Sequence, residues 1–186
     1  MPFTVIYDAN VLYPFHLRDI LIRVAQAGLV HARWTDKILD EWFDNLTEQR
    51  PELTERLKRT RTLMSESIRD VLVQNYENLI DGLKLPHDKD RHVLAAAIKA
   101  GAQIIVTFNT KHFPPEVIDP NGIQEMEAQD PDTFLFNVID LNPKAVAQVI
   151  RDIEADLHSR PGIPYVLDAL AKAGLARSVE AIKAHL

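Results

Sequence analysis

Four acidic residues stand out, three of them where expected elements of secondary structure begin or end and one on an expected helix. Asp8 follows a short apolar run, and Glu41 lies near the buried edge of an expected helix. Asp88 and Asp90 come just before another helix. In a parallel sheet these acids could converge on one edge, where their like charges would require a neutralising cation. Hard oxygen ligands suit Mg²⁺ or Mn²⁺, and such an ion activates water, so the pattern indicates metal-assisted phosphodiester hydrolysis.

Each acid alone also has an ordinary structural explanation. Asp8 could be a turn residue after a strand, and Glu41 a solvated helix residue. Asp88 or Asp90 is expected to cap the following helix, because a short acidic side chain accepts hydrogen bonds from the first free backbone N–H groups. Only the combination of the four favours a site.

The elements that would position these acids alternate between strand and helix. Thr35 is expected to cap the helix that carries Glu41. Residues 51–75 are expected to form a long amphipathic helix or a helix pair, and residues 111–121 mostly loop. Strands are expected at 3–7, 29–34 and 104–106, and helices at 16–28, 36–47, 76–82 and from about 90 to Gly101. This order predicts an α/β fold with a parallel central sheet and helices on both faces.

The composition excludes several classes of protein. The 186 residues contain no cysteine, so disulfides and thiolate metal sites are impossible, which fits a reducing cytoplasm. No apolar stretch is long enough to cross a membrane, and Asp8 interrupts the early apolar run, so no signal peptide is expected. The net charge of −6 argues against binding nucleic acid through bulk charge, although a local basic face remains compatible with it.

The pattern changes to short helices from Pro131 onwards. We predict a domain over 1–120 and a helical C-terminal extension over 121–186, with the junction near residues 120–130. The extension's apolar residues could pack against the core, a second subunit or a protein partner, and a structural cover is the preferred interpretation. Its helices are expected at 131–140, 143–158, 164–174 and 176–185.

Four segments resemble the signature motifs of PIN-domain nucleases. They are DANVLYP at 8–14, TDKILDEW at 35–42, DKDRHVLAAAIKAGA at 88–102 and IVTFNTKHFP at 105–114. The branch they are most similar to is the VapC-like toxins of bacterial toxin–antitoxin pairs. The residues after 119 resemble the helical C-terminal extension of one VapC subgroup. The resemblance implies a three-layer α/β/α domain that uses Mg²⁺ or Mn²⁺ to cut single-stranded or looped RNA.

The resemblance also implies roles for individual residues. The fourth acidic position of the family falls at Asn109, where this sequence departs from the common pattern. A neutral amide can still ligate a metal or hold a metal-bound water, but it adds no charge. The metal-binding acids would be Asp8, Glu41 and Asp90, with Asp88 in support. Neighbouring polar residues expected to support them are Asn10, Thr35 and Thr107. Independently of the resemblance, the basic side of the expected helix over 51–75 is the best local candidate for contacts to RNA phosphates, and a solvated helix face is the equally weighted alternative. The candidate contacts are Arg56, Arg59, Arg61 and His112.

Partners and alternatives follow from the same residues. The resemblance implies an RNA substrate, a small cognate antitoxin, a homodimer and a cytoplasmic location. A catalytically impaired PIN-fold binding module is the main alternative, because Asn109 lacks the expected charge. A haloacid-dehalogenase-like phosphohydrolase would need a second acid where Asn10 stands. A zinc site would use His87, Asp88 and His92.

Overall fold

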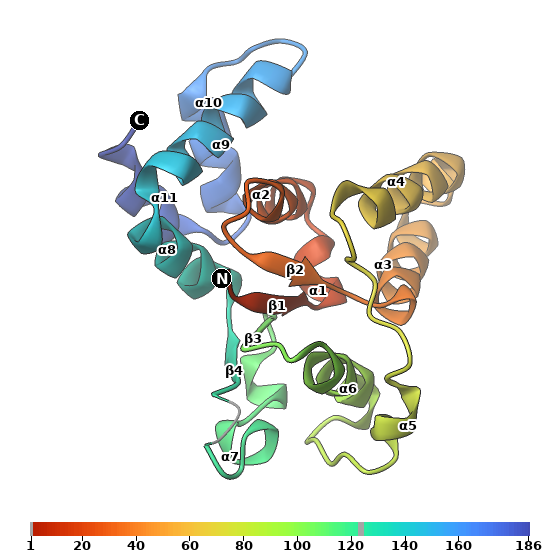
Figure 1. Ribbon diagram of the computed structural model, residues 1–186. Coiled ribbons are helices and arrows are strands. Elements are labelled where there is room, and N and C mark those ends of the chain that lie inside the picture. The colour runs from red at the N-terminus through yellow and green to blue at the C-terminus, as the bar shows by residue number, and fades with distance from the viewer. Residues whose placement is uncertain (1, 123–124) are drawn as a thin grey trace.

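A parallel sheet of four strands lies at the centre of the computed structural model, which describes residues 2–122 and 125–186 (Figure 1). Its strand order is β2-β1-β3-β4, so β1 is paired on both sides. Val5 lies opposite Ala32 of β2 and Ile104 of β3, which fixes the register of the three strands. The strands are β1 (Thr4–Tyr7), β2 (His31–Arg33), β3 (Ile104–Val106) and β4 (Glu127–Gln129).

The two central strands are buried because their sequences are apolar on both faces. Val5, Ile6, Ile105 and Val106 have no exposed surface, as expected for a parallel strand covered by helices above and below. The predicted strands at 3–7 and 104–106 are therefore confirmed almost to the residue. The strand predicted at 29–34 is also present but shorter.

Helices cover both faces of the sheet, which confirms the predicted α/β architecture. Figure 1 shows α2 above the sheet and α6 below it. Gly101 ends α6 in a left-handed conformation, with φ of 61°, as the sequence predicts. The helices of this part are α1 (Ala9–Leu12), α2 (Phe15–Gln26), α3 (Asp36–Gln49), α4 (Thr54–Ser67), α5 (Glu77–Ile80), α6 (Arg91–Ala100) and α7 (Pro115–Ile118). Three short 3₁₀ turns within the described residues are η1 (Pro51–Leu53), η2 (Asp88–Asp90) and η3 (Thr110–His112).

Several segments differ from the prediction. A short helix, α1, follows Asp8 where none is expected, and η3 and α7 lie in the segment 111–121 that is expected to be mostly loop. The helix expected over 51–75 ends at Ser67, because the following residues extend the sheet instead: Trp34 N donates to Val71 O at 3.0 Å, and Val73 N donates to Trp34 O at 2.8 Å. The strand β4 is missing from the prediction, and it lies within the expected junction near residues 120–130. The division into 1–120 and 121–186 stays a prediction.

The C-terminal residues form the helices that the sequence predicts. These are α8 (Pro131–Leu141), α9 (Pro143–Asp156), α10 (Ile163–Lys172) and α11 (Ala176–Lys183). In Figure 1 they gather beside α2, on one side of the sheet. The ring of Phe134 on α8 meets the ring of Tyr7 edge to face, with 5.9 Å between centroids. The extension thus packs directly on the strand that carries Asp8 at its end.

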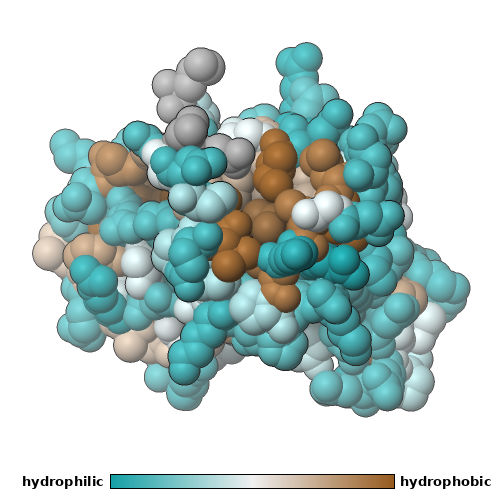
Figure 2. All heavy atoms as spheres, turned by 90° about the horizontal axis from the view of Figure 1, so that it is seen from below, coloured by the Kyte–Doolittle hydropathy of each residue, from teal (hydrophilic) through white to brown (hydrophobic). Residues whose placement is uncertain are grey.

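The surface seen from below is mostly hydrophilic (Figure 2). One group of hydrophobic side chains gathers near the middle of that face, surrounded by polar ones. Within the described part of the chain, no helix is both long and apolar enough to cross a membrane.

Asp130 lies between β4 and α8, and its hydrogen bonds predict that the stability of the fold depends on pH. Partial burial alone would raise the pKa of Asp130, but hydrogen bonds from Thr133 and from the backbone of Asp132 lower it below 3.8. A lowered pKa contributes stability above the unfolded value and loses it as pH falls through the folded value. Asp130→Ala should therefore cost about 1 kcal/mol at pH 7 and less at pH 3, measured by urea unfolding.

Asp130→Ser is the matched control, because it keeps a capping oxygen that does not titrate. The difference in free energy of unfolding between Asp130→Ser and Asp130→Ala should be the same at pH 7 and pH 3. A cost of Asp130→Ala that does not change between pH 7 and pH 3 would contradict the role of the charge.

Candidate active site

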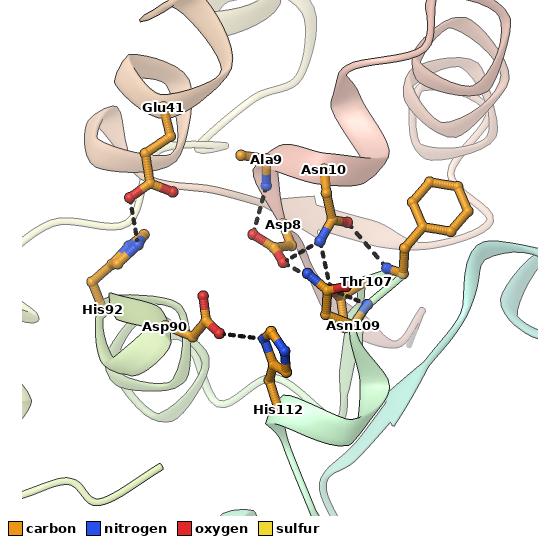
Figure 3. A network of polar contacts seen from close by, with 10 residues as sticks. Asp8, Ala9, Asn10, Glu41, Asp90, His92, Thr107, Asn109 and His112 are labelled. Atoms are coloured by element: carbon orange, nitrogen blue, oxygen red, sulfur yellow. Dashed lines mark hydrogen bonds and ion pairs between the residues drawn. The ribbon is translucent and has the colours of Figure 1, made fainter. Parts of the chain in front are cut away.

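A surface cavity of about 400 Å³ lies at the carboxyl ends of β1 and β3. Four of the predicted catalytic residues, which are up to 101 positions apart in the sequence, meet in its lining: Asp8, Glu41, Asp90 and Asn109. Figure 3 shows the three carboxylates pointing towards a common space. The remaining lining residues are Ala9, Asn10, Tyr13, Asn45 and Gln49.

Asp8 is buried at the floor of this cavity and is held by three hydrogen bonds. Ala9 N donates to Oδ1 at 2.7 Å, because Asp8 is also the N-cap of α1. Oδ2 accepts from Asn10 Nδ2 at 2.9 Å and from Thr107 Oγ1 at 2.7 Å. The orientation of the carboxylate is therefore fixed before any ligand arrives.

The charge of Asp8 is nevertheless costly in this position. Burial raises the pKa of Asp8 above its ordinary value, and the hydrogen bonds from Thr107 and Ala9 oppose that rise. The nearby carboxylates of Asp90 and Glu41 raise the pKa of Asp8 further. A cation in the cavity would relieve both the repulsion and the desolvation.

Thr107 ties the ends of the two central strands together. Its hydroxyl group donates to Asp8 and accepts from Asn10 Nδ2 at 2.9 Å and from Asn109 N at 3.1 Å. One donor and two acceptor sites are thereby all used. Asn10 adds a further link, because its Oδ1 accepts from Phe108 N at 3.0 Å. Asn10 and Thr107 thus lie where the sequence predicts supporting residues.

Glu41 reaches the cavity from the middle of α3. The helix begins at Thr35, whose Oγ1 accepts from Ile38 N at 3.1 Å, as predicted. His92 Nε2 lies 3.0 Å from Glu41 Oε1, a short ion-pair distance without hydrogen-bond geometry. Lys37 Nζ is 3.7 Å from the same oxygen. The buried ring of His92 therefore faces Glu41 directly.

Asp90 is held by a histidine and not by the helix that it precedes. Its Oδ2 lies 2.7 Å from His112 Nδ1, and the ring of His112 stacks on that of His87 with 3.8 Å between centroids. The side chain makes no capping hydrogen bond to α6, and neither does that of Asp88. The prediction that Asp88 or Asp90 caps the helix with its carboxylate is therefore wrong. The turn before α6 is the 3₁₀ turn η2, and the carboxylate of Asp90 contacts His112 instead.

Other predicted site residues lie outside the cavity lining. Asp88 is exposed and lies 3.6 Å from Arg91. Arg61 forms ion pairs with Asp36 and Asp40 and so joins α4 to α3. Arg56 and Arg59 are exposed on α4, and neither has an ion-pair partner within the described chain.

The donor set fits a hydrated magnesium or manganese ion better than zinc. No three histidines or acids in residues 2–122 and 125–186 form a group that could hold an ion in this arrangement. Mg²⁺ usually keeps several waters and binds one or two carboxylates, which the cavity lining can supply. Zinc needs close, direct ligands, whereas His87 stacks on His112 and His92 is buried against Glu41.

Tyr13, Asn45 and Gln49 line the cavity but are absent from the predicted site residues, and His92 is predicted only as a ligand of the alternative zinc site. His92 has no nearby partner in the sequence that would reveal its contact with Glu41. Asn45 and Gln49 lie four and eight positions after Glu41, which places all three on one face of α3. That helical spacing could have identified the two amides.

Comparison with known proteins agrees with this geometry. The family model described as PIN domain matches residues 4–111, so the chain belongs to the PIN-domain family. A second model, described as the VapC50 C-terminal domain, matches residues 131–184. These matches define a VapC-like PIN protein with a C-terminal extension, and they favour this class over a haloacid dehalogenase.

A particular relative is the Mycobacterium tuberculosis (strain ATCC 25618 / H37Rv) protein named "Putative ribonuclease VapC50". It is 35% identical over 123 residues, which cover 66% of this chain and 70% of the relative. No solved structure matches the chain.

Thr107 provides a direct test of the hydrogen-bond network around Asp8. Thr107→Val keeps the shape but removes the hydroxyl group, so Asp8 loses one of its three hydrogen bonds, and Asn10 Nδ2 and Asn109 N each lose an acceptor. Leaving such groups unsatisfied should lower the free energy of unfolding by about 1–3 kcal/mol, measured by urea unfolding of the metal-free protein. Thr107→Ser, which keeps the hydroxyl group, should lose less. Equal stability of the valine variant and the wild type would refute the network.

Proposed function

We propose that the protein is a metal-dependent endoribonuclease and the toxin of a VapBC-like toxin–antitoxin pair. The observation that carries the proposal is the convergence of Asp8, Glu41 and Asp90 in one cavity at the carboxyl edge of a PIN-domain sheet. The relative named as a ribonuclease supports the same activity. The proposal therefore joins a site that suits phosphodiester chemistry to a family that contains nucleases.

The side chains that would hold Mg²⁺ or Mn²⁺ are those of Asp8, Glu41 and Asp90, whereas Asp88 lies outside the cavity lining and would act on the ion only through its charge. A bound ion of this kind supplies an activated water and stabilises negative charge on a phosphodiester. The protein's part is to keep the acids in place. Asp8 is fixed by Thr107, and Asp90 by His112. Asn109 would orient a metal ligand or a water through its amide.

The proposed substrate is unpaired RNA. The cavity is an opening on the protein surface, and single strands or loops can place a backbone phosphate there more readily than a regular duplex. The exposed side chains of Arg56 and Arg59 on α4 are the proposed phosphate contacts, because they have no ion-pair partner within the described residues. Arg61 and His112 are paired with acids, so any contact with RNA would compete with those pairs.

A small antitoxin is the proposed protein partner, and a homodimer and a cytoplasmic location belong to the same family-based proposal. Support for a protein partner comes from a hollow between α2 and α4. Phe15 and Leu63 line this hollow and are 55% and 65% exposed, respectively. Apolar side chains at that exposure gain stability when a partner covers them.

Substitution of Asp8 tests the proposed nuclease activity. Asp8→Ala should lower the rate of RNA cleavage by more than ~100-fold, because loss of a mere supporting partner in a metal site already costs ~10–100-fold. Mg²⁺ or Mn²⁺ should raise the melting temperature of the wild type, since a ligand that binds only the folded state stabilises it. The alanine variant should show neither effect.

Asp140→Ala is the matched control, because Asp140 is an exposed acid on α8 outside the cavity lining. It should keep both the cleavage rate and the thermal shift. Cleavage of RNA by Asp8→Ala at the wild-type rate, or growth arrest on its expression, would refute the assignment. A wild-type protein that shows no metal-induced shift and no cleavage would instead be a binding module that keeps the PIN fold.

Substitution of Asn109 by aspartate tests whether the missing fourth acid weakens metal binding. Asn109→Asp adds a negative charge to the cavity lining, so it should tighten Mg²⁺ binding by about tenfold in a calorimetric titration. Asn78→Asp adds the same charge on α5, away from the cavity, and should leave the affinity unchanged. An unaltered affinity in Asn109→Asp would mean that the side chain at position 109 does not face the ion.

A further inference from the structure

The cavity extends beyond the three acids into an uncharged part. Tyr13, Asn45 and Gln49 line the same space of about 400 Å³ as Asp8 and Glu41. A volume in this range accommodates small organic ligands, so the cavity has room for more than a hydrated ion. The acids and the uncharged residues therefore form two parts of one binding site.

The uncharged part is built on one face of α3. Asn45 and Gln49 follow Glu41 by one and two helical turns, and the side chains of all three reach the cavity. Glu48 is exposed on the same helix, as Asn45 and Gln49 are, but it does not line the cavity. The lining therefore reflects the direction of the side chain and not only its position near the end of the helix.

Tyr13 fixes the direction of the Gln49 amide. Its hydroxyl group donates to Gln49 Oε1 at 2.6 Å and so joins the end of α1 to α3. Once Oε1 accepts this bond, the Nε2 group of Gln49 has two donor positions available for a ligand. Asn45 has no side-chain hydrogen bond among the described residues, so both its donors and its acceptor are free.

The distribution of charge assigns different parts of an RNA substrate to the two parts of the cavity. A phosphate approaches the carboxylates only where a cation neutralises them. A nucleobase carries no charge and presents donors and acceptors at its edges, which side-chain amides match with pairs of hydrogen bonds. The base of a nucleotide beside the scissile phosphate therefore suits the amide-lined part.

We propose that Asn45 and Gln49 read an unpaired nucleobase next to the scissile phosphate, with Tyr13 as the positioning residue that orients Gln49. This inference rests on the proposed ribonuclease function and adds its determinant of sequence preference. The ordinary alternative is that both amides are solvated residues of an exposed helix face.

The test uses the full-length protein and a pool of unstructured RNA with random sequence. Cleavage sites are mapped by sequencing for the wild type, Asn45→Ala and Gln49→Ala, with Glu48→Ala as the matched control. Each amide variant should lose about tenfold in base preference at one position beside the cut, and the control should keep the wild-type pattern. Tyr13→Phe should weaken the same preference as Gln49→Ala, because it frees the Gln49 amide to rotate.

Metal-induced thermal shifts, measured on the same proteins, separate this inference from the proposed function. The amide variants should keep the wild-type shift, since the acids are intact. A variant that cuts RNA with an unchanged base preference would overturn the inference and leave the nuclease assignment standing. So would an equal loss of rate at every site, which would indicate contacts to sugar or phosphate. Absence of cleavage by the wild type would overturn both.

Gln49→Met provides a second variant in case the alanine variant is unstable. It keeps the length of the side chain but removes the amide. Its loss of base preference, with a melting temperature close to that of the wild type, would support the reading role. Retention of the wild-type base preference by a folded Gln49→Met protein would count against it.

Discussion

Repulsion between carboxylates is the constraint on which the site and much of the surrounding structure depend. Asp8, Glu41 and Asp90 carry like charges that repel one another, and the carboxylates of Asp90 and Glu41 add to the rise that burial causes in the pKa of Asp8. The fold gives each acid its own partner from a different part of the chain. Thr107 holds Asp8, while His92 and His112 face the other two. Each of the three acids therefore has a protein group beside it that helps to hold it in place.

The topology of the sheet brings this arrangement about. The chain leaves β1 through α2 to β2 on one side and later returns through α6 to β3 on the other, so the strand order reverses at β1. Ligands bind at such a reversal in open α/β sheets, because the loops diverge there and leave a crevice. Asp8 and Thr107 terminate the two strands at that point. Phe134 of the extension packs on Tyr7, just before Asp8, and thereby helps to hold the floor of the cavity.

Local sequence predicted the parts of the site that depend on local structure. Asp8 and Thr107 are polar residues that directly follow apolar strands, so their positions at the sheet edge could be predicted. β4 could not, because Glu127–Gln129 has no apolar pattern and forms a strand only by pairing with β3. The contact of His112 with Asp90 was equally hidden, since it joins residues 22 positions apart and replaces the expected helix cap. Non-local contacts thus account for what was missed.

The amide at Asn109 has a consequence for the charge of the cavity. With Asp8, Glu41 and Asp90 ionised, one divalent ion leaves a single net negative charge on these groups. An acid in place of Asn109 would leave two, which would bind the ion more tightly but repel a substrate phosphate more strongly. The backbone N–H of Asn109 donates to Thr107 Oγ1. An asparagine in place of an acid at position 109 leaves this backbone hydrogen bond intact. Under the proposed function, the departure from the family pattern would exchange metal affinity for easier approach of the phosphate.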